Sequence, residues 1–588
     1  MSVNGPQSRN ELGDAHGADR LDSWKEIAAY LKRVERTVRR WEEKDGLPVH
    51  RHQHKSRAAI FAYKSELDAW WNNGQRLEDR QVPRASRKPH LVWLLGLAAA
   101  VAAAGSLIFF RYRVPATSPT LIPWIAVLPL ENLSGDPQQE YFADGLTETL
   151  ITDLGKISAL RVISRTSVMQ YKGTKKPISE IARELKVDAL VEGAVMRSGE
   201  RVRITAQLIE APTDRHLWAE SYDRDLHDVL ALQAEVAQAI AREVKATVSV
   251  TERQRFTHSH RVEPGAYEAY LKGRYHWNKR TSEGFQKAAD LFNEAIRIDP
   301  DFAPAYVGLA DTYAIWYYSP LPIGVRLSHA RDAATHALLL DESLAEAHNS
   351  RAYLFHRFEW DWAGAEAEFK RALQLNGGYT TAHQWYALFL ASMGRFDEAT
   401  AEARFARDLD PVSPAARATL GRAYYFARRF PEAIQQFQAA LELDDNFSSA
   451  RFDLARVYAL TGKAQEGAAE IQRVITQNGT NASFLAELGY AYAKAGRARE
   501  ARAALAEVQK RRVREHVAPA TMAWLFAGLG EYDQAIRWLQ REYSEQGNYL
   551  PFINTDPSLD GLRSQPHFQE LLAKLRFPNS PATPGTNH

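Results

Sequence analysis

The chain has 588 residues, of which 45% are hydrophobic and 25% charged, so it is long enough for several folded domains. Its formal net charge of +2 hides an uneven distribution, because residues 1–90 hold 18 Lys and Arg against 13 Asp and Glu. It contains no cysteine, which excludes disulfides, thiolate metal sites and cysteine nucleophiles.

Residues 1–20 are polar without an apolar period and are predicted to be disordered. A compact domain follows over residues 21–72. It opens with a capping box, Ser23-x-x-Glu26, before an amphipathic first helix. The second helix turns Val38 and Trp41 inward. It projects four side chains of the kinds that bond guanine edges and phosphates in a major groove, namely Arg36, Thr37, Arg39 and Arg40.

A hairpin is predicted next, starting at residues 47–49 and returning over residues 58–63, with Ser65 capping a last helix that ends in Trp70 and Trp71. The hairpin carries three basic residues that we expect at the DNA backbone, namely Arg51, Lys55 and Arg57. The alternating His50, His52 and His54 would share one face of a strand. That pattern is compatible with a metal, but a phosphate-contacting surface is favoured, so no metal is predicted.

This domain resembles the winged helix-turn-helix of the excisionase and MerR type. The resemblance rests on Trp41 at the end of the second helix, the Gly46-Leu47-Pro48 step and the Leu67-x-x-Trp70 close. It implies binding to double-stranded DNA. The alternative is a solvated charged face, because Glu35, Glu42 and Glu43 alternate with the arginines. No MerR-like dimerisation coiled coil follows, so dimerisation must come from elsewhere.

Residues 73–90 are polar and basic, as in a juxtamembrane linker, and residues 91–110 form an uninterrupted apolar run. Twenty helical residues span the roughly 30 Å of a bilayer core, so we predict a single transmembrane helix. A buried core helix and a signal peptide are the alternatives, the latter disfavoured because about 90 residues precede the run. The span carries a stripe of small residues suited to helix packing, at Gly96, Ala100 and Ala104.

Charge on the two flanks predicts the orientation. Five cations lie before the span, namely Arg76, Arg80, Arg84, Arg87 and Lys88, whereas Arg111 and Arg113 follow it. By the positive-inside rule the N-terminus is cytoplasmic. We therefore expect a single-pass protein of the bacterial inner membrane whose C-terminal domains are exported to the periplasm.

After a linker over residues 111–123, apolar runs alternate with amphipathic stretches over residues 124–251. Strands are predicted near residues 124–130, 160–164, 188–197, 201–211 and 216–223, with three helices, giving an α/β domain. The segments IAVLPLENLSGDPQQEYFADGLTETLITDL and IARELKVDALVEGAVMRSGERVRITAQLIEA resemble the amino-terminal domain of TolB-like proteins. That resemblance implies an interaction or sensing module. Asp144 and Glu148 are one helical turn apart and could be an acid/base pair. We favour the interpretation that they lie on the solvent-facing side of an amphipathic helix.

Residues 263–577 carry a repeat of 34 residues, marked by Gly394, Gly462, Gly496 and Gly530, with Arg428 where one glycine is missing. This is the tetratricopeptide signature, and it predicts seven or eight helical hairpins stacked into an all-α superhelix with a concave face. That face is expected to bind a protein or peptide partner. Aromatic residues in the first repeats suit either that site or the core, namely Trp316–Tyr318, Trp360, Trp362 and Trp385. The tail over residues 578–588 is predicted to be loose.

The sequence holds no GxxxxGK[ST], GxGxxG, HExxH or GxSxG motif, so no enzyme activity and no cofactor are predicted. The order of domains resembles the CadC and ToxR class of membrane-anchored one-component regulators, with a different DNA reader. It implies that a signal at the exported domains changes chain association, so that a homodimer binds DNA. One rival interpretation is a membrane-anchored scaffold that assembles envelope proteins and binds no DNA. A third is a receptor half of the kind shared with cyclases or kinases, which is disfavoured because the sequence carries no catalytic motif of either.

Overall fold

The computed structural model describes residues 19–52, 59–75, 124–257, 261–316, 319 and 321–578. The chain divides into two compact units, Met1–Ser118 and Pro119–His588, and each is described by itself. The predicted transmembrane run with Gly96, Ala100 and Ala104 lies outside the described residues, as do Lys55 and Arg57. Among the helices that are described, none combines the length and the apolar character needed to cross a bilayer.

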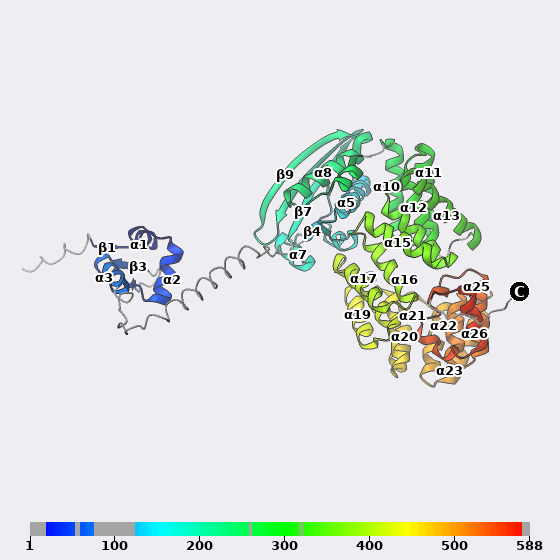
Figure 1. The fold of residues 1–588 in the computed structure, drawn as a ribbon. Helices are drawn as coiled ribbons and strands as arrows, with labels where there is room; N and C mark the ends of the chain where they lie inside the picture. Colours follow the sequence, from blue (N-terminus) through cyan, green and yellow to red (C-terminus); the bar gives the residue numbers. More distant parts are fainter. Residues whose placement is uncertain are drawn as a thin grey trace, which may run out of the picture. The chain divides into compact units, whose positions relative to one another are not determined.

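The described residues of the first unit form three helices and a small sheet (Figure 1). The helices are α1 (Trp24–Tyr30), α2 (Glu35–Asp45) and α3 (Lys64–Gln75), and the strands are β1 (Arg20–Leu21), β2 (His50–His52) and β3 (Ala59–Tyr63). The strands are antiparallel in the order β1-β3-β2. The predicted succession of two helices, a hairpin and a third helix is confirmed, whereas strand β1 was not predicted.

Of the two helix caps predicted in this unit, one is confirmed and the other is wrong. Ser23 caps α1, because its Oγ accepts a hydrogen bond from the Glu26 N–H at 3.2 Å. The prediction that Ser65 caps the last helix is wrong, since α3 already begins at Lys64. Strand β1 brings Asp19 to this helix start: its carbonyl accepts from the Lys64 N–H at 2.9 Å, and its carboxylate accepts from Ser65 Oγ at 2.7 Å.

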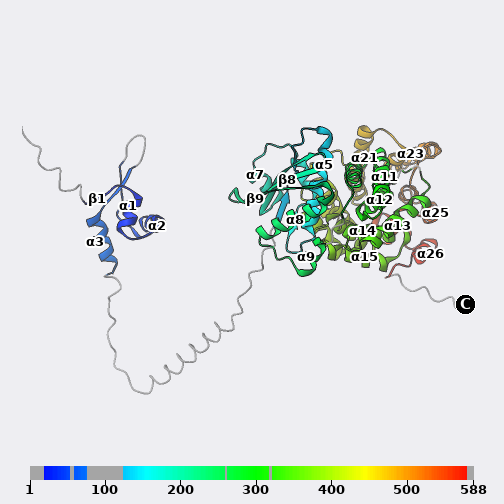
Figure 2. The ribbon, with the colours of Figure 1, turned by 90° about the horizontal axis from the view of Figure 1, so that it is seen from above.

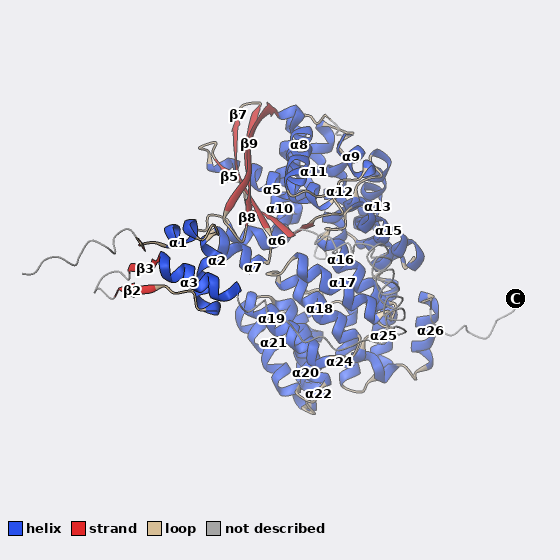
Figure 3. Ribbon diagram, turned by 60° about the vertical axis from the view of Figure 1, so that its left-hand side comes forward, coloured by secondary structure: helices blue, strands red, loops and turns tan. Residues whose placement is uncertain are grey.

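The second unit opens with an α/β domain whose strands gather on one side of the unit (Figure 3). Its strands are β4 (Trp124–Val127), β5 (Glu131–Asn132), β6 (Arg161–Val162), β7 (Ala189–Ser198), β8 (Arg201–Glu210) and β9 (Arg215–Asp225). Its helices are α5 (Glu140–Gly155), α6 (Arg165–Val168), α7 (Ile178–Leu185), α8 (Val229–Glu243) and α9 (Val250–Thr257). Short 3-10 turns occupy Pro137–Gln139, Met169–Tyr171 and Leu226–Asp228.

The sheet runs in the order β6-β4-β7-β8-β9, with β5 added beside β7. Strand β4 is parallel to both β6 and β7, and β7, β8 and β9 form an antiparallel meander. All five predicted strands are confirmed. The larger core of the domain lies between the sheet and helices α5 and α8, which separate the strands from the first helical repeats (Figure 2). Strand β8 alternates buried and exposed residues because only one of its faces meets that core.

After the α/β domain, the described residues form a run of eight helical hairpins, in agreement with the seven or eight that the 34-residue period predicts. The first helices of the hairpins are α10 (Pro264–Asn278), α12 (Ala303–Ile315), α14 (Ala345–Leu354), α16 (Thr380–Ser392), α18 (Pro414–Phe426), α20 (Ser448–Leu460), α22 (Ala482–Lys494) and α24 (Pro519–Gly528). The second helices are α11 (Ser282–Ile298), α13 (Ile323–Leu340), α15 (Trp362–Leu375), α17 (Phe396–Leu409), α19 (Phe430–Leu443), α21 (Ala464–Asn478), α23 (Ala498–Arg511) and α25 (Tyr532–Ser544).

In most of the hairpins a left-handed residue lies in the turn between the two helices. Gly394, Gly462, Gly496 and Gly530 supply it with φ between 72° and 80°. Arg428 stands where the glycine is missing and adopts φ 59°, so the backbone of the turn is kept without the glycine. A short π-helix (Phe355–Glu359) precedes another left-handed residue, Trp360, with φ 58°.

The C-terminal segment folds back on the first helices of the repeats. Its 3-10 turns (Leu550–Phe552 and Pro557–Leu562) contact α16, α20 and α24, and helix α26 (Pro566–Leu575) follows. Asp556 is fully buried and accepts hydrogen bonds from Trp524 Nε1 at 2.9 Å and from the Tyr549 hydroxyl at 2.7 Å. Along this stretch the face predicted to bind a partner is therefore occupied by the chain itself.

The predicted aromatic cluster is largely structural. Trp316 and Trp362 are buried, and the Trp362 Nε1 donates to the Leu575 carbonyl at 2.9 Å. Trp360 stacks on Tyr543 of α25 at 4.9 Å between ring centroids, which joins the third hairpin to the last. Tyr317 and Tyr318 lie outside the described residues.

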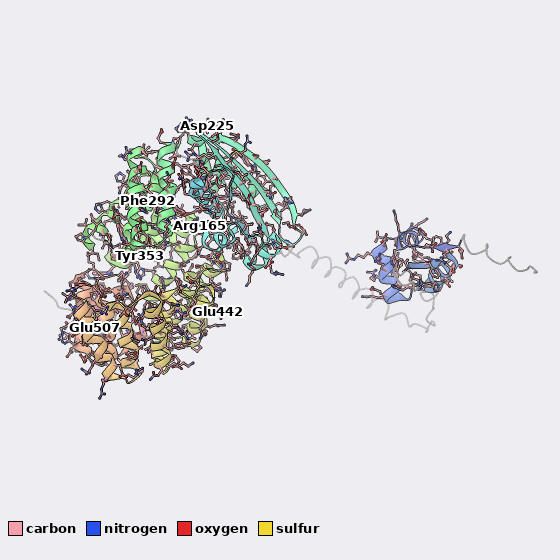
Figure 4. The ribbon with its side chains drawn as sticks, turned by 180° about the vertical axis from the view of Figure 1, so that it is seen from behind. Arg165, Asp225, Phe292, Tyr353, Glu442 and Glu507 are labelled. Atoms are coloured by element: carbon pink, nitrogen blue, oxygen red, sulfur yellow. The ribbon has the colours of Figure 1, made fainter. Side chains whose placement is uncertain are left out.

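The α/β domain packs directly on the early repeats, and the junction contains buried polar contacts. Glu148 of α5 forms ion pairs with Arg274 of α10 and, at 3.2 Å, with Arg165 of α6, which lies where the domain meets the repeats (Figure 4). Burial would raise the pKa of Glu148, but the two arginines hold it below its ordinary value. The expectation that Asp144 and Glu148 face water is wrong, because α5 is covered by α8 on one side and α10 on another.

Further along the junction, the Ser164 N–H donates to the Leu409 carbonyl at 2.8 Å, and Ser167 Oγ donates to the Asp410 carboxylate at 2.5 Å. Asp410 is only 2% exposed. Gly155 and Gly378 also approach closely, since a Cβ on Gly378 would lie 3.2 Å from the Gly155 Cα. The α/β domain and the repeats therefore share a tight, specific interface.

Candidate nucleic-acid interface

A small apolar core holds the first two helices of the N-terminal unit together. Ile27 of α1, Val38 of α2 and Leu67 of α3 are fully buried. Lys32 takes φ 52° in the turn between α1 and α2 and lets the chain reverse within four residues. Helix α2 ends where Gly46 takes φ 67°, and the Leu47 N–H donates to the Trp41 carbonyl at 3.1 Å. These contacts hold α2 with one face in the core and the other in solvent.

Two of the predicted DNA-contacting arginines lie free on that solvent face. Arg36 and Arg40 are exposed, and neither has a carboxylate partner among the described residues. Thr37 is half-buried, nearer the core than the arginines. The guanidinium groups of Arg36 and Arg40 are thus available to a nucleic acid without first breaking an ion pair.

The Arg39 side chain contacts other side chains of its own domain. Its guanidinium lies 3.6 Å from the Glu35 carboxylate and 5.1 Å from the centre of the Trp24 ring. The side chain remains 56% exposed, so these contacts are weak and solvent-screened. Arg39 is therefore oriented back along α2 toward α1, and it is less available to a base than its neighbours.

Arg51 joins the predicted wing to the predicted recognition helix. Its Nη2 donates to Glu42 Oε1 of α2 at 2.5 Å. Strand β2 carries Arg51 opposite Ile60 of β3, which fixes the register of the hairpin. Glu42, which in the sequence belongs to a charged helix face, thus positions a wing arginine.

Among the three histidines of the predicted wing, the structure describes the side chain of His50. His50 Nε2 lies 2.6 Å from Glu66 Oε2, and its ring stacks on Phe61 at 5.3 Å between centroids. Across the residues that the structure describes, no group of three potential metal ligands is found, and His54 lies outside them.

The structure adds two cations that the sequence analysis does not single out. Lys32 and Arg33 occupy the turn between α1 and α2, and both are exposed. Arg33 Nη1 donates to the Lys32 carbonyl at 3.0 Å. Their position could have been predicted from the short turn itself, since cations in such a turn lie at the end of α2 that carries Arg36 and Thr37.

Comparison with protein families identifies two parts of the chain. Residues 122–239 match the HilA/YgeH-like transcriptional regulator family, in its second domain. Residues 390–446 and 418–483 match the tetratricopeptide repeat, which confirms the predicted repeats there. The resemblance of the α/β domain to TolB-like proteins and that of the N-terminal domain to excisionases stay predictions.

Among characterised proteins, the chain is similar to "Putative adenylate cyclase 3" of Rhizobium meliloti, with 42% identity over 188 residues. The match covers 32% of each chain, so it spans about a third of the relative's length.

Two solved structures are also similar. One is from a study of Pseudomonas aeruginosa pilF, with 20% identity, a TM-score of 0.30, and 40% of this chain and 97% of that chain covered. The other is a human IFIT1 dimer with m7Gppp-AAAA, with 14% identity, a TM-score of 0.40, and 71% and 98% covered. These scores carry no argument about function.

Proposed function

We propose that this protein is a membrane-anchored, non-enzymatic transcriptional regulator that binds double-stranded DNA through α2 and the β2–β3 wing. The observation that carries the proposal is the pairing of a helix-turn-helix bearing free arginines with a domain matching a transcriptional-regulator family. The α/β domain and repeats serve as the sensing part, and the apolar run over residues 91–110 as the anchor.

In the proposed topology the N-terminal unit is cytoplasmic and the second unit exported, as the basic residues before the span favour. Homodimerisation, supported by the stripe at Gly96, Ala100 and Ala104, would bring two readers onto a paired DNA site. Ligand or partner binding at the second unit then shifts the population of dimers.

The test is DNA binding by the N-terminal unit, which has its own core, made dimeric by a fused coiled coil. We expect salt-dependent binding to duplex DNA and a recoverable sequence preference from random oligonucleotides. Absence of both would favour the rival function, a membrane-anchored scaffold without DNA binding. A periplasm-dependent reporter fused after Phe577 should be active and one fused at Asn73 inactive, and the reverse pattern would refute the topology.

A further inference from the structure

Three of the hairpin turns use a left-handed residue that is not glycine. They are Arg280 after α10 (φ 56°), Trp360 after the π-helix (φ 58°) and Arg428 after α18 (φ 59°). A side chain in this conformation is unfavourable relative to glycine, because its Cβ lies too close to the following carbonyl oxygen. A glycine would therefore serve the turn better unless the side chain itself has a role.

For two of the three, that role is visible within the chain. Trp360 stacks on Tyr543 of the last hairpin. Arg428 Nη2 donates to both carboxylate oxygens of Asp560, at 2.7 and 3.0 Å, in the C-terminal segment. Both side chains thus hold distant parts of the fold together.

Arg280 has no such partner among the described residues. Its guanidinium lies 3.5 Å above the centre of the Trp277 ring, and Arg274 lies over the same ring at 4.5 Å. Arg274 is satisfied by Glu148, whereas in the described part of the chain the Arg280 side chain makes no hydrogen bond or ion pair, and only its backbone N–H donates, to the Trp277 carbonyl at 3.1 Å. The residue is exposed to solvent, and the surrounding protein atoms together with repulsion by Arg274 lower the pKa of Arg280 to about 10, against the attraction of Asp311 and Glu148.

Polar groups without partners lie in the same neighbourhood. Asn349 of α14 is fully buried, and neither atom of its amide group finds a hydrogen-bonding partner in the described residues; the indole Nε1 of Trp277 likewise finds none. Tyr379 lies near both residues, because it is an electrostatic neighbour of Arg280 and its hydroxyl lies close enough to the Asn349 side chain to lower the pKa of Tyr379 against the effect of burial. Buried polar groups are nearly always paired in folded proteins, so this set is incomplete.

We propose that Arg280 anchors a binding site for a small anion with a carboxylate or phosphate group, at the first repeats beside the α/β domain. A planar guanidinium fixed on an aromatic ring is preorganised for such an anion, which would also relieve the repulsion from Arg274. The site lies near the junction with α5, so its occupant would contact the part of the molecule that we propose to be the sensor.

The experiment measures binding of two probes, inorganic phosphate and succinate, to the full-length protein in detergent at constant ionic strength. Calorimetric titration and thermal unfolding are followed for the wild type, Arg280→Gly, Arg280→Lys and Arg428→Gly. Glycine suits the left-handed turn at both positions, so Arg428→Gly is a matched control for the change in backbone.

We expect at least one probe to bind the wild type and Arg428→Gly alike, and to bind Arg280→Gly at least tenfold more weakly. Arg280→Lys should be intermediate, since it keeps the charge and loses the planar stack. Preference for phosphate over succinate, or the reverse, identifies the chemical class. Equal binding to the wild type and Arg280→Gly, or no binding of either probe up to about 10 mM, overturns the proposal. The DNA-binding test uses only the N-terminal unit, so either proposal can fail without the other.

Discussion

The two units use arginine in opposite ways. In the N-terminal unit, Arg36 and Arg40 are exposed and have no carboxylate partner among the described residues. Their helix packs against a core of six buried, small or medium apolar side chains. In the second unit, Arg274 is largely buried against Glu148, and Arg456 against Glu487 at 2.8 Å. The free cations suit a charged partner from outside, whereas the buried pairs fix how one part of the fold sits on another. Arg280 departs from this division, since it lies in the second unit and is unpaired among the residues described.

The buried pairs give the largest expected effect. Replacing Arg274 with Ala leaves the Glu148 charge in the junction with only Arg165 and Asn278 as partners, so we expect a loss of about 3–5 kcal/mol in the free energy of unfolding. Denaturant unfolding of the full-length protein measures it. Lys287→Ala is the control, because its pair with Glu283 is exposed on one helix and should change stability by less than about 0.5 kcal/mol. Equal effects of the two variants would show that the junction is not held by this pair.

Asp311, near Arg274, gives the next largest effect and makes stability depend on pH. Burial raises its pKa to about 6 from an ordinary 3.8, despite the attraction of Arg274. The folded state then binds a proton that the unfolded state has lost, so the free energy of unfolding falls as pH rises from about 4 to about 6. The contribution is about 3 kcal/mol over that interval.

Asp311→Asn keeps the shape of the side chain and removes the titration. The difference in stability between wild type and this variant should change over that interval and be constant above about pH 7. A difference independent of pH would show that Asp311 has an ordinary pKa. Other carboxylates titrate in the same range, and the comparison between the two proteins cancels their contribution.

The free arginines of α2 should matter only when DNA is present. Arg36→Ala and Arg40→Ala should each cost about 1–3 kcal/mol in binding to the preferred site if they contact base edges. Arg39→Ala should cost less, because Arg39 already contacts Glu35 and Trp24. Binding titrations with the dimerised N-terminal unit measure all three, and the order would be refuted if Arg39→Ala had the largest effect.

Replacing a residue that contacts the DNA backbone should affect binding differently from replacing a residue that contacts a base edge. Lys55 lies outside the described residues, and its replacement by Ala should weaken binding to all sequences alike and reduce the salt slope by about 1.

The sequence predicts local structure better than it predicts contacts between distant segments. Periodicity identifies the strands of the α/β domain and the hairpins, because each depends on neighbours along the chain. Ser65 was misassigned because its cap is replaced by Asp19, which is distant in sequence and arrives through strand β1. Glu148 was misread for the same reason: a helix face that looks solvated in the sequence is covered by α10, more than a hundred residues later.

The candidate DNA interface shows the same limit. The residue types and their face on α2 were predictable, but the capture of Arg39 by Trp24 and of Arg51 by Glu42 required the packed domain. The occupation of the face formed by the first helices of the repeats was not predictable either. Nothing in the pattern around Asp556 indicates that it is buried among Tyr425, Trp524 and Tyr549.

The smallest expected effects come from the left-handed turns, and they test whether glycine and arginine are interchangeable there. Gly462→Ala places a Cβ at φ 80° with open space around it, so the cost is conformational alone, about 1 kcal/mol. Arg428→Gly removes that same strain but also the exposed pair with Asp560, worth about 0.2–1 kcal/mol. The two terms partly cancel, so we expect Arg428→Gly to be more stable than the wild type by between about 0 and 0.8 kcal/mol. Unfolding of the two variants under identical conditions checks both values, and a marked loss in Arg428→Gly would mean that the pair with the C-terminal segment outweighs the strain of the turn.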